Sequence, residues 1–296
     1  MSSAVGVLTD TTASIPTPLA KELQIELVPY FIHRGLDTLR DMVDVQPEPF
    51  AKYLQTTDRL PLTSNPSVGD YLNGFKRLAE RTKDIVALTM TSKGSGAYQA
   101  CKAAAEVLKE RAPNVRVEVV DTLKVAMAHG WSAIEAARAA LDGHDFGGVV
   151  DRAKDVAHQS SMIMTADTLK YLHMGGRIGR AQHLVGSLLD IKPLIGIEDG
   201  MISALGAART RSKAYARMVE LIRQRAGAAK CLKVAVTHVG APDQAAQLRE
   251  LVLEEFDCVE VITTPLSPAL GVHSGPGTVG VSFFNDQCVI ESEAER

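Results

Sequence analysis

The stretch LTSNPSVGDY at residues 62–71 marks the point where an extended segment ends and an amphipathic helix begins. Pro66 lacks a backbone donor, and Ser67 followed by Asp70 is typical of a helix N-cap with its capping-box partner. Three small hydroxyl groups therefore lie beside free N–H groups at the positive end of a helix, those of Thr63, Ser64 and Ser67. This arrangement favours a small anion such as a carboxylate or a phosphate. A polar turn that only caps a surface helix is the commoner origin of such a stretch.

Strand-like and helical segments alternate on both sides of this stretch. Apolar runs typical of strands occupy residues 4–9, 25–32, 85–90 and 115–120. The helical period of 3.6 residues, or an alanine-rich composition, marks residues 71–79, 95–111 and 123–141. This alternation predicts an α/β fold with a largely parallel sheet that helices cover on both faces.

The second half of the chain is less regular. Gly143, Gly147 and Gly148 loosen the chain where the pattern changes, so we place a boundary at residue 158. Residues 1–158 then form an N-terminal α/β domain and residues 159–296 a C-terminal α/β domain. Asp199-Gly200 is a strong hairpin signal between two strands. Beyond it we expect helices at 211–226 and 242–255, strands at 232–237 and 259–263, and a loop rich in Pro and Gly before a last strand at 279–284.

Composition limits the classes of function. The 296 residues are 46% hydrophobic and 23% charged, which are globular values that allow a sizeable core. A net charge of −3 and an aromatic content of 5% argue against a nucleic-acid surface. No apolar run reaches the length of a membrane span, and we expect a soluble cytoplasmic protein. The widely spaced cysteines are expected to be buried small hydrophobes, without a disulfide or a metal: Cys101, Cys231, Cys258 and Cys288.

The segment KGSGAY at residues 93–98 follows a predicted strand and precedes a helix, where ligands bind in parallel sheets. A nucleophile elbow needs glycine at Lys93 and Ala97, and a dinucleotide fingerprint needs glycine at Gln99. A P-loop is absent as well. What remains is the Ser95 hydroxyl and loop N–H groups that suit an anion, and a simple tight turn fits the segment equally well.

The segment HSGPGTVG at residues 273–280 formally matches a glycine-rich nucleotide motif. It leads into a strand and Pro276 removes one donor, so we discard the nucleotide interpretation. His273 lies in this loop between Gly271 and Gly275, which permit a close backbone approach. A lone loop histidine is more often structural than functional, and the other histidines lack metal-ligand spacing.

Two basic segments stay ambiguous from the residues alone. Residues 175–180, GGRIGR, open an amphipathic helix that carries Leu184, Val185, Leu188 and Leu189. Arg177 and Arg180 suit an anionic membrane or a partner, but an ordinary surface helix explains the same pattern. Arg209, before the helix at 211–226, belongs either to a solvated basic cluster or to an inward-facing anion contact.

Read in order, these segments resemble the DegV family over almost the whole chain. The matching segments are residues 7–12, 63–67, 95–99, 167–172, 175–178, 192–193, 199–200, 209–210 and 273–277. Two positions depart from the family pattern, which often has glutamine where Asn65 stands and threonine where Ala97 stands. The change at Ala97 removes a hydroxyl group next to Ser95.

The resemblance implies a two-domain fold that binds one long-chain fatty acid between its domains. It implies that the protein presents the carboxylate to a separate ATP-dependent fatty acid kinase subunit and then carries the acyl phosphate to phospholipid synthesis. Thr63, Ser64 and Ser95 would hold the carboxylate. Gly96, Arg209, His273 and Gly275 would complete the head-group site, and Arg177 and Arg180 would face the membrane or the partner. The resemblance implies no catalytic residue, no metal and no cofactor besides the lipid.

Burial energies agree with such a ligand. About 15 methylenes at ~0.8 kcal/mol each contribute roughly 12 kcal/mol before ordering costs, whereas each hydrogen bond to a charged head group adds about 1.5–3 kcal/mol. The apolar tunnel should thus determine affinity, and the polar loops should determine which end faces out. The alternative is a stand-alone serine esterase or thioesterase that uses Ser95 and His273, although no carboxylate is evident to orient His273.

Overall fold

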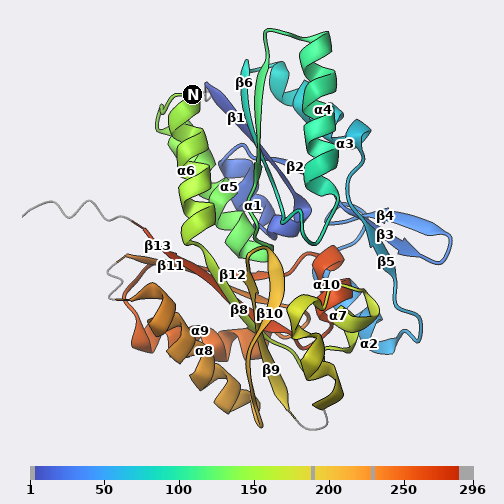
Figure 1. Ribbon diagram of the computed structural model, residues 1–296, viewed down its shortest axis with the longest axis vertical. Helices are drawn as coiled ribbons and strands as arrows, with labels where there is room; N and C mark the ends of the chain where they lie inside the picture. Colours follow the sequence, from blue (N-terminus) through green and yellow to red (C-terminus); the bar gives the residue numbers. More distant parts are fainter. Residues whose placement is uncertain (1–3, 188–190, 228–230, 287–296) are drawn as a thin grey trace, which may run out of the picture.

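The computed structural model describes residues 4–187, 191–227 and 231–286, which form two large sheets and one small sheet (Figure 1). The first sheet is parallel throughout, with the order β2-β1-β6-β7. Its strands are β1 (Val5–Asp10), β2 (Glu26–Val28), β6 (Asp84–Thr89) and β7 (Arg116–Asp121). The predicted α/β fold with a parallel N-terminal sheet is confirmed.

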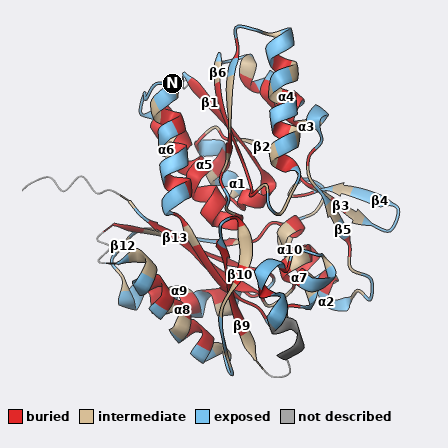
Figure 2. Ribbon diagram, viewed as in Figure 1, coloured by how far each residue is buried: buried red, intermediate tan, exposed pale blue. Residues whose placement is uncertain are grey.

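Helices cover both faces of the first sheet. The 3-10 helix η1 (Thr11–Ala13) and α1 (Thr17–Glu22) connect β1 to β2, and the larger helices are α3 (Val68–Ala79), α4 (Ala97–Arg111), α5 (Ala126–Leu141) and α6 (Phe146–Gln159). Alternate side chains of β1 enter different cores: Leu8 packs on the side of α3 and α4, and Val7 on the side of α5 and α6. Figure 2 shows the buried strands between helices with exposed outer faces.

The second sheet is mixed, with the order β10-β9-β8-β13-β11-β12, and only its β11–β12 pair is parallel. Its strands are β8 (Ser161–Thr165), β9 (Lys192–Glu198), β10 (Met201–Ala208), β11 (Leu232–His238), β12 (Cys258–Pro265) and β13 (Val279–Asn285). One face packs against α8 (Arg211–Ala226) and α9 (Pro242–Glu255). The predicted hairpin at Asp199-Gly200 joins β9 to β10 in antiparallel pairing.

A small third sheet extends from the first sheet towards the second. It has the order β4-β3-β5, and its strands are β3 (Phe31–Arg34), β4 (Asp37–Arg40) and β5 (Leu62–Ser64). The helix α2 (Pro47–Thr56) lies within this excursion beside α7 (Lys170–Met174) and α10 (Pro268–Ser274) of the second half (Figure 1). The Tyr171 hydroxyl donates to the Leu54 carbonyl at 3.4 Å. The chain reaches β8 directly after α6, but because of this excursion the boundary at residue 158 stays a prediction.

Helix α5 holds the first and second sheets together. Glu135, almost fully buried on α5, accepts hydrogen bonds from Arg152 of α6 and from Lys233 of β11. Lys233 and Arg152 also contact Asp286 after β13, at 2.9 and 2.7 Å. This network of opposite charges spans both sheets, so their relative position does not depend on apolar packing alone.

Several sequence predictions were wrong. Residues 25–32 form two strands in different sheets, because Pro29 lacks a donor and interrupts the ladder. Gly147 and Gly148 do not loosen the chain but lie in the first turn of α6, where Asp145 caps Gly148. The loop before the last strand contains α10, which Pro268 begins. Cys231 is disulfide-bonded.

The expected amphipathic helix after Gly176 also differs from the prediction. It is a 3-10 helix, η2 (Gly179–Ser187). Leu188 and Leu189 lie outside the described residues, as do the side chains of Leu184 and Val185.

Candidate functional site

A cavity of about 430 Å³ lies where the carboxyl ends of the first sheet meet the second sheet, a volume typical of small-molecule sites. Its wall combines the loops after β1, β6 and β7, the link to β3, the end of β5, and the strands and helices β8, β9, α7 and α10. The parallel topology brings the loop segments together, because parallel strands end at the same edge. The candidate site is thus built by all three sheets.

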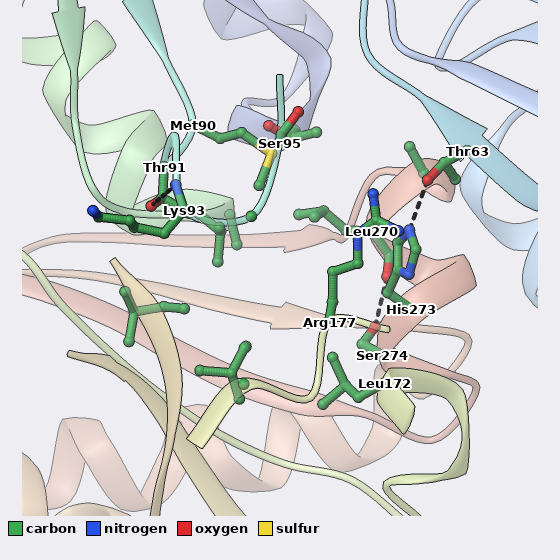
Figure 3. A pocket seen from close by; sticks show the side chains of 18 of the residues that line it. Thr63, Met90, Thr91, Lys93, Ser95, Leu172, Arg177, Leu270, His273 and Ser274 are labelled. Atoms are coloured by element: carbon green, nitrogen blue, oxygen red, sulfur yellow. Dashed lines mark hydrogen bonds between the residues drawn. The ribbon is translucent and has the colours of Figure 1, made fainter. Parts of the chain in front are cut away.

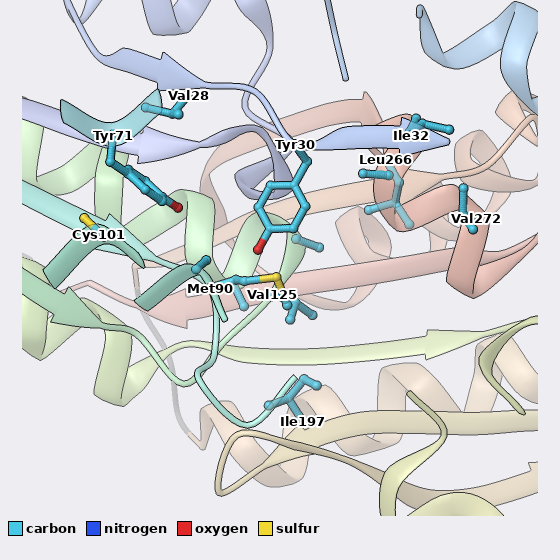
Figure 4. Packing of buried hydrophobic residues seen from close by; sticks show 14 of the residues in the cluster. Val28, Tyr30, Ile32, Tyr71, Met90, Cys101, Val125, Ile197, Leu266 and Val272 are labelled. Carbon is cyan, nitrogen blue, oxygen red and sulfur yellow. The ribbon is translucent and has the colours of Figure 1, made fainter. Parts of the chain in front are cut away.

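Most of the cavity wall is apolar. Figure 4 shows Met90, Val125, Ile197 and Leu266 around the same core, and Met162 and Met164 of β8 complete that part of the wall. Methionine side chains adapt to irregular shapes, so this wall suits a flexible alkyl chain. The charged residues that line the described cavity are two cations, Lys93 and Arg177, without an aspartate or glutamate among them. The site therefore favours a molecule with an apolar body and a negative or acceptor head group.

Thr63 and His273 meet at one side of the cavity, although 210 residues separate them. Thr63 Oγ1 lies 2.6 Å from Nε2 of His273 (Figure 3). Burial, with a smaller contribution from Arg177, lowers the pKa of His273 to about 4, so its imidazole is neutral at pH 7. Its Nδ1 atom is buried and has no hydrogen-bond partner. His273 occupies the last turn of α10, not a loop.

Two glycines allow this packing around His273. A Cβ atom at Gly175 would collide with Nδ1 of His273. Gly275 has a φ of +81°, and a Cβ atom there would collide with the ring of Tyr171. Gly275 was expected in the head-group site, but the structure places it behind His273 and outside the cavity wall.

Ser95 also lines the cavity, just before α4 (Figure 3). Its Oγ accepts the N–H of Ala97 at 3.2 Å and lies 2.7 Å from the Tyr30 hydroxyl. The sequence interpretation missed Tyr30, because one tyrosine in an apolar run gives no signal of a polar contact. Ser64 also lines the cavity, and its Oγ lies 2.9 Å from Nε2 of His33.

The two positions that depart from the family pattern lie near Ser95 in the structure. Ala97 is fully buried at the first position of α4. Asn65 lines the cavity, and its side-chain amide donates to the Pro66 carbonyl at 2.7 Å. Gly96 does not line the cavity, but a Cβ atom there would come within 3.1 Å of the Asn65 side-chain oxygen. Gly96 therefore makes room for Asn65.

The basic residues separate into inner and outer groups. Arg177 lines the cavity (Figure 3). Its Nη1 donates to the Gly175 carbonyl at 2.9 Å. Arg180 lies outside, where it pairs with Asp199 at 3.1 Å. Arg209 is exposed after β10 and does not line the cavity. Arg177, predicted to face a membrane or a partner, is therefore placed to contact a ligand as well.

Within residues 4–187, 191–227 and 231–286, side chains of His, Cys, Asp and Glu do not gather into a group of three or more that would hold a metal ion. No helix among these described residues combines the length and the apolar character needed to cross a bilayer.

The fold and the cavity define an α/β protein with an apolar cavity and a cationic lining. Residues 4–286 match the family model described as "Uncharacterised protein, DegV family". A DegV domain-containing protein of Streptomyces coelicolor is 36% identical over 288 residues, which are 95% of this chain and 98% of the relative. One of Clostridium perfringens is 32% identical over 283 residues, or 96% and 99% of the two chains. The chain belongs to the DegV family.

Solved structures of the family share the fold. A DegV family protein from Thermus thermophilus, described for its fatty acid binding, has a TM-score of 0.90 at 26% identity, with 96% of this chain and 100% of that chain covered. DegV from Bacillus subtilis, described as a fatty acid binding protein, has a TM-score of 0.86 at 25% identity, with 96% and 100% covered. The arrangement of the sheets is therefore that of DegV proteins.

Proposed function

We propose that this protein binds one long-chain fatty acid in the cavity, with its alkyl chain against the apolar wall and its carboxylate near Thr63, Ser95, His273 and Arg177. The single observation that carries the proposal is the lining, which is apolar over most of its area and has cations as its charged residues. Family membership supports it, because DegV proteins of the same fold are described as fatty acid binding proteins.

We further propose that the protein works in the cytoplasm and presents the carboxylate to a separate ATP-dependent fatty acid kinase subunit. The acyl phosphate would then be carried to phospholipid synthesis at a membrane surface. Ser64 and Arg209 are exposed and suit contacts with such a partner, while Arg180 is paired with Asp199. In this role the protein is a lipid-presenting subunit that supplies neither the ATP site nor the catalytic base.

The esterase alternative receives no support from the hydrogen bonds. A serine nucleophile requires contact with a histidine base, and that base requires an orienting partner. Ser95 is bonded to Tyr30 and Ala97, whereas His273 is bonded to Thr63 and has an unpartnered Nδ1 atom.

Lipid extraction tests the proposed function directly. Purified protein should yield a long-chain fatty acid at near one-to-one occupancy in organic extracts followed by mass spectrometry, because burial of ~15 methylenes opposes release during purification. Protein stripped of lipid should take up added fatty acid saturably. An extract without acyl species, together with no saturable uptake, would refute fatty acid binding.

Arg177→Met should weaken fatty acid binding about tenfold, because a hydrogen bond between charged groups is lost at a partly solvated site. Arg180→Met is the matched control: it removes the same cation three residues away, outside the cavity, and should leave the dissociation constant within about twofold. Calorimetric titration of stripped protein measures both. Equal effects of the two substitutions would show that Arg177 does not contact the head group.

A further inference from the structure

The Tyr30 phenol is a polar group in the cavity wall that the proposed carboxylate contacts do not use. Tyr30 lies in the two-residue link between β2 and β3, and it is 5% exposed. Its ring reaches into the core between the sheets, with the hydroxyl directed towards Met90 (Figure 4). The hydroxyl contacts Ser95 Oγ at 2.7 Å.

The backbone of Tyr30 is held on both sides. Its N–H donates to Thr11 Oγ1 at 3.1 Å, and its carbonyl accepts the N–H of Asp41 at 2.8 Å. The Thr11 hydroxyl in turn donates to Oδ2 of Asp41 at 2.6 Å, and Oδ1 of Asp41 accepts the N–H of Ala269 on α10 at 3.0 Å. All of these groups are buried, so the network fixes the phenol before any ligand arrives.

The Ser95 hydroxyl can form only a limited number of hydrogen bonds, and this determines the role of its contact with the Tyr30 hydroxyl. A serine hydroxyl has one proton to donate and two acceptor positions. The Ala97 N–H occupies one acceptor position. A phenol is a stronger acid than an aliphatic alcohol and is the better donor of the pair, so Tyr30 occupies the second. Burial raises the pKa of Tyr30 well above its ordinary value, which keeps this proton in place at neutral pH.

We propose that Tyr30 is a positioning residue that leaves the Ser95 hydroxyl as a donor aimed into the cavity. The site then selects a head group that only accepts hydrogen bonds, such as a carboxylate, over a primary alcohol with the same alkyl chain, which also needs an acceptor. This inference deepens the proposed function and rests on it, because it assigns the basis of head-group selectivity in the same cavity.

The test compares palmitic acid with 1-hexadecanol on lipid-free protein. Tyr30→Phe should lower the affinity for the acid about fivefold and leave the affinity for the alcohol within about twofold, since the Ser95 oxygen freed by the substitution can accept from an alcohol O–H, whereas a carboxylate only accepts. Tyr71→Phe is the matched control, because Tyr71 is buried in the same core, does not line the cavity and has an unpartnered hydroxyl. It should leave the ratio of the two affinities unchanged.

A Ser95→Ala background shows whether Tyr30 acts through Ser95. In that background, adding Tyr30→Phe should not change the acid-to-alcohol ratio any further. If Tyr30→Phe alone keeps the wild-type ratio, or lowers both affinities equally, the phenol only packs against the ligand and the inference is wrong. If wild-type protein binds neither compound, the proposed function fails instead, and the two failures are thereby distinguished.

Discussion

Replacing Trp131 with alanine should lower the free energy of unfolding by about 3–5 kcal/mol, the usual effect of truncating a fully buried aromatic side chain. Trp131 lies on α5 and is fully buried. Its ring packs edge-on against Phe284 of β13, with centroids 5.6 Å apart, and its indole N–H donates to the Ser282 carbonyl at 3.4 Å. The substitution thus removes packing between the first and second sheets, and urea unfolding followed by circular dichroism measures the change.

Leu141→Ala provides the control for this prediction. Leu141 is the last residue of the same helix and is 38% exposed, so its truncation should cost less than about 1 kcal/mol. If the free energy of unfolding of Trp131→Ala is within about 1 kcal/mol of the wild-type value, the contact between α5 and β13 contributes little to stability. The ion network around Glu135 would then be what holds the two sheets together.

The polar loops of the site were predictable from sequence because their chemistry is local. The N-cap at Ser67 is observed with both hydrogen bonds of a capping box, as Pro66 and Asp70 indicated. The turn before α4 places Ser95 at the carboxyl edge of the first sheet, which follows from strand and helix order alone. Local signals of this kind fix where hydroxyl groups lie along the chain. Parallel topology brings together the loops after β1, β6 and β7, whereas Thr63 and Ser64 lie on β5 of an antiparallel sheet.

The remaining site residues depend on contacts between distant segments, which local patterns do not encode. His273 reaches Thr63 because α10 is anchored at its start by Asp41, 228 residues from Ala269 in the chain. Arg177 and Arg180 have the same local sequence context, yet one lines the cavity and the other pairs with Asp199. The sequence around Tyr30 is that of an ordinary strand, and only its backbone partners reveal its position in the site. Tertiary packing thus determines where Tyr30, Arg177 and His273 lie.

His273→Ala should reduce acyl phosphate formation at least about 100-fold while fatty acid binding stays within roughly tenfold. The apolar wall provides most of the binding energy, so the loss of one neutral contact affects it little. Charge builds on the head group during phosphoryl transfer, and positioned donors matter most at that step. Because the pKa of His273 is about 4, the imidazole is neutral throughout the range from pH 6 to 8. The loss should therefore be equal at both ends of that range.

Arg209→Ala and His158→Ala complete this experiment, in which each variant is loaded with fatty acid and mixed with kinase and ATP. Arg209 is exposed outside the cavity, so its removal should slow acyl phosphate formation through the partner contact and leave lipid binding unchanged. His158 is an exposed histidine at the end of α6, away from the cavity, and its variant should behave as wild type.

Lipid-loaded His273→Ala that reacts at the wild-type rate would make His273 a structural residue of α10. A variant that no longer holds lipid would make it a binding residue only, because transfer would then fail for lack of substrate.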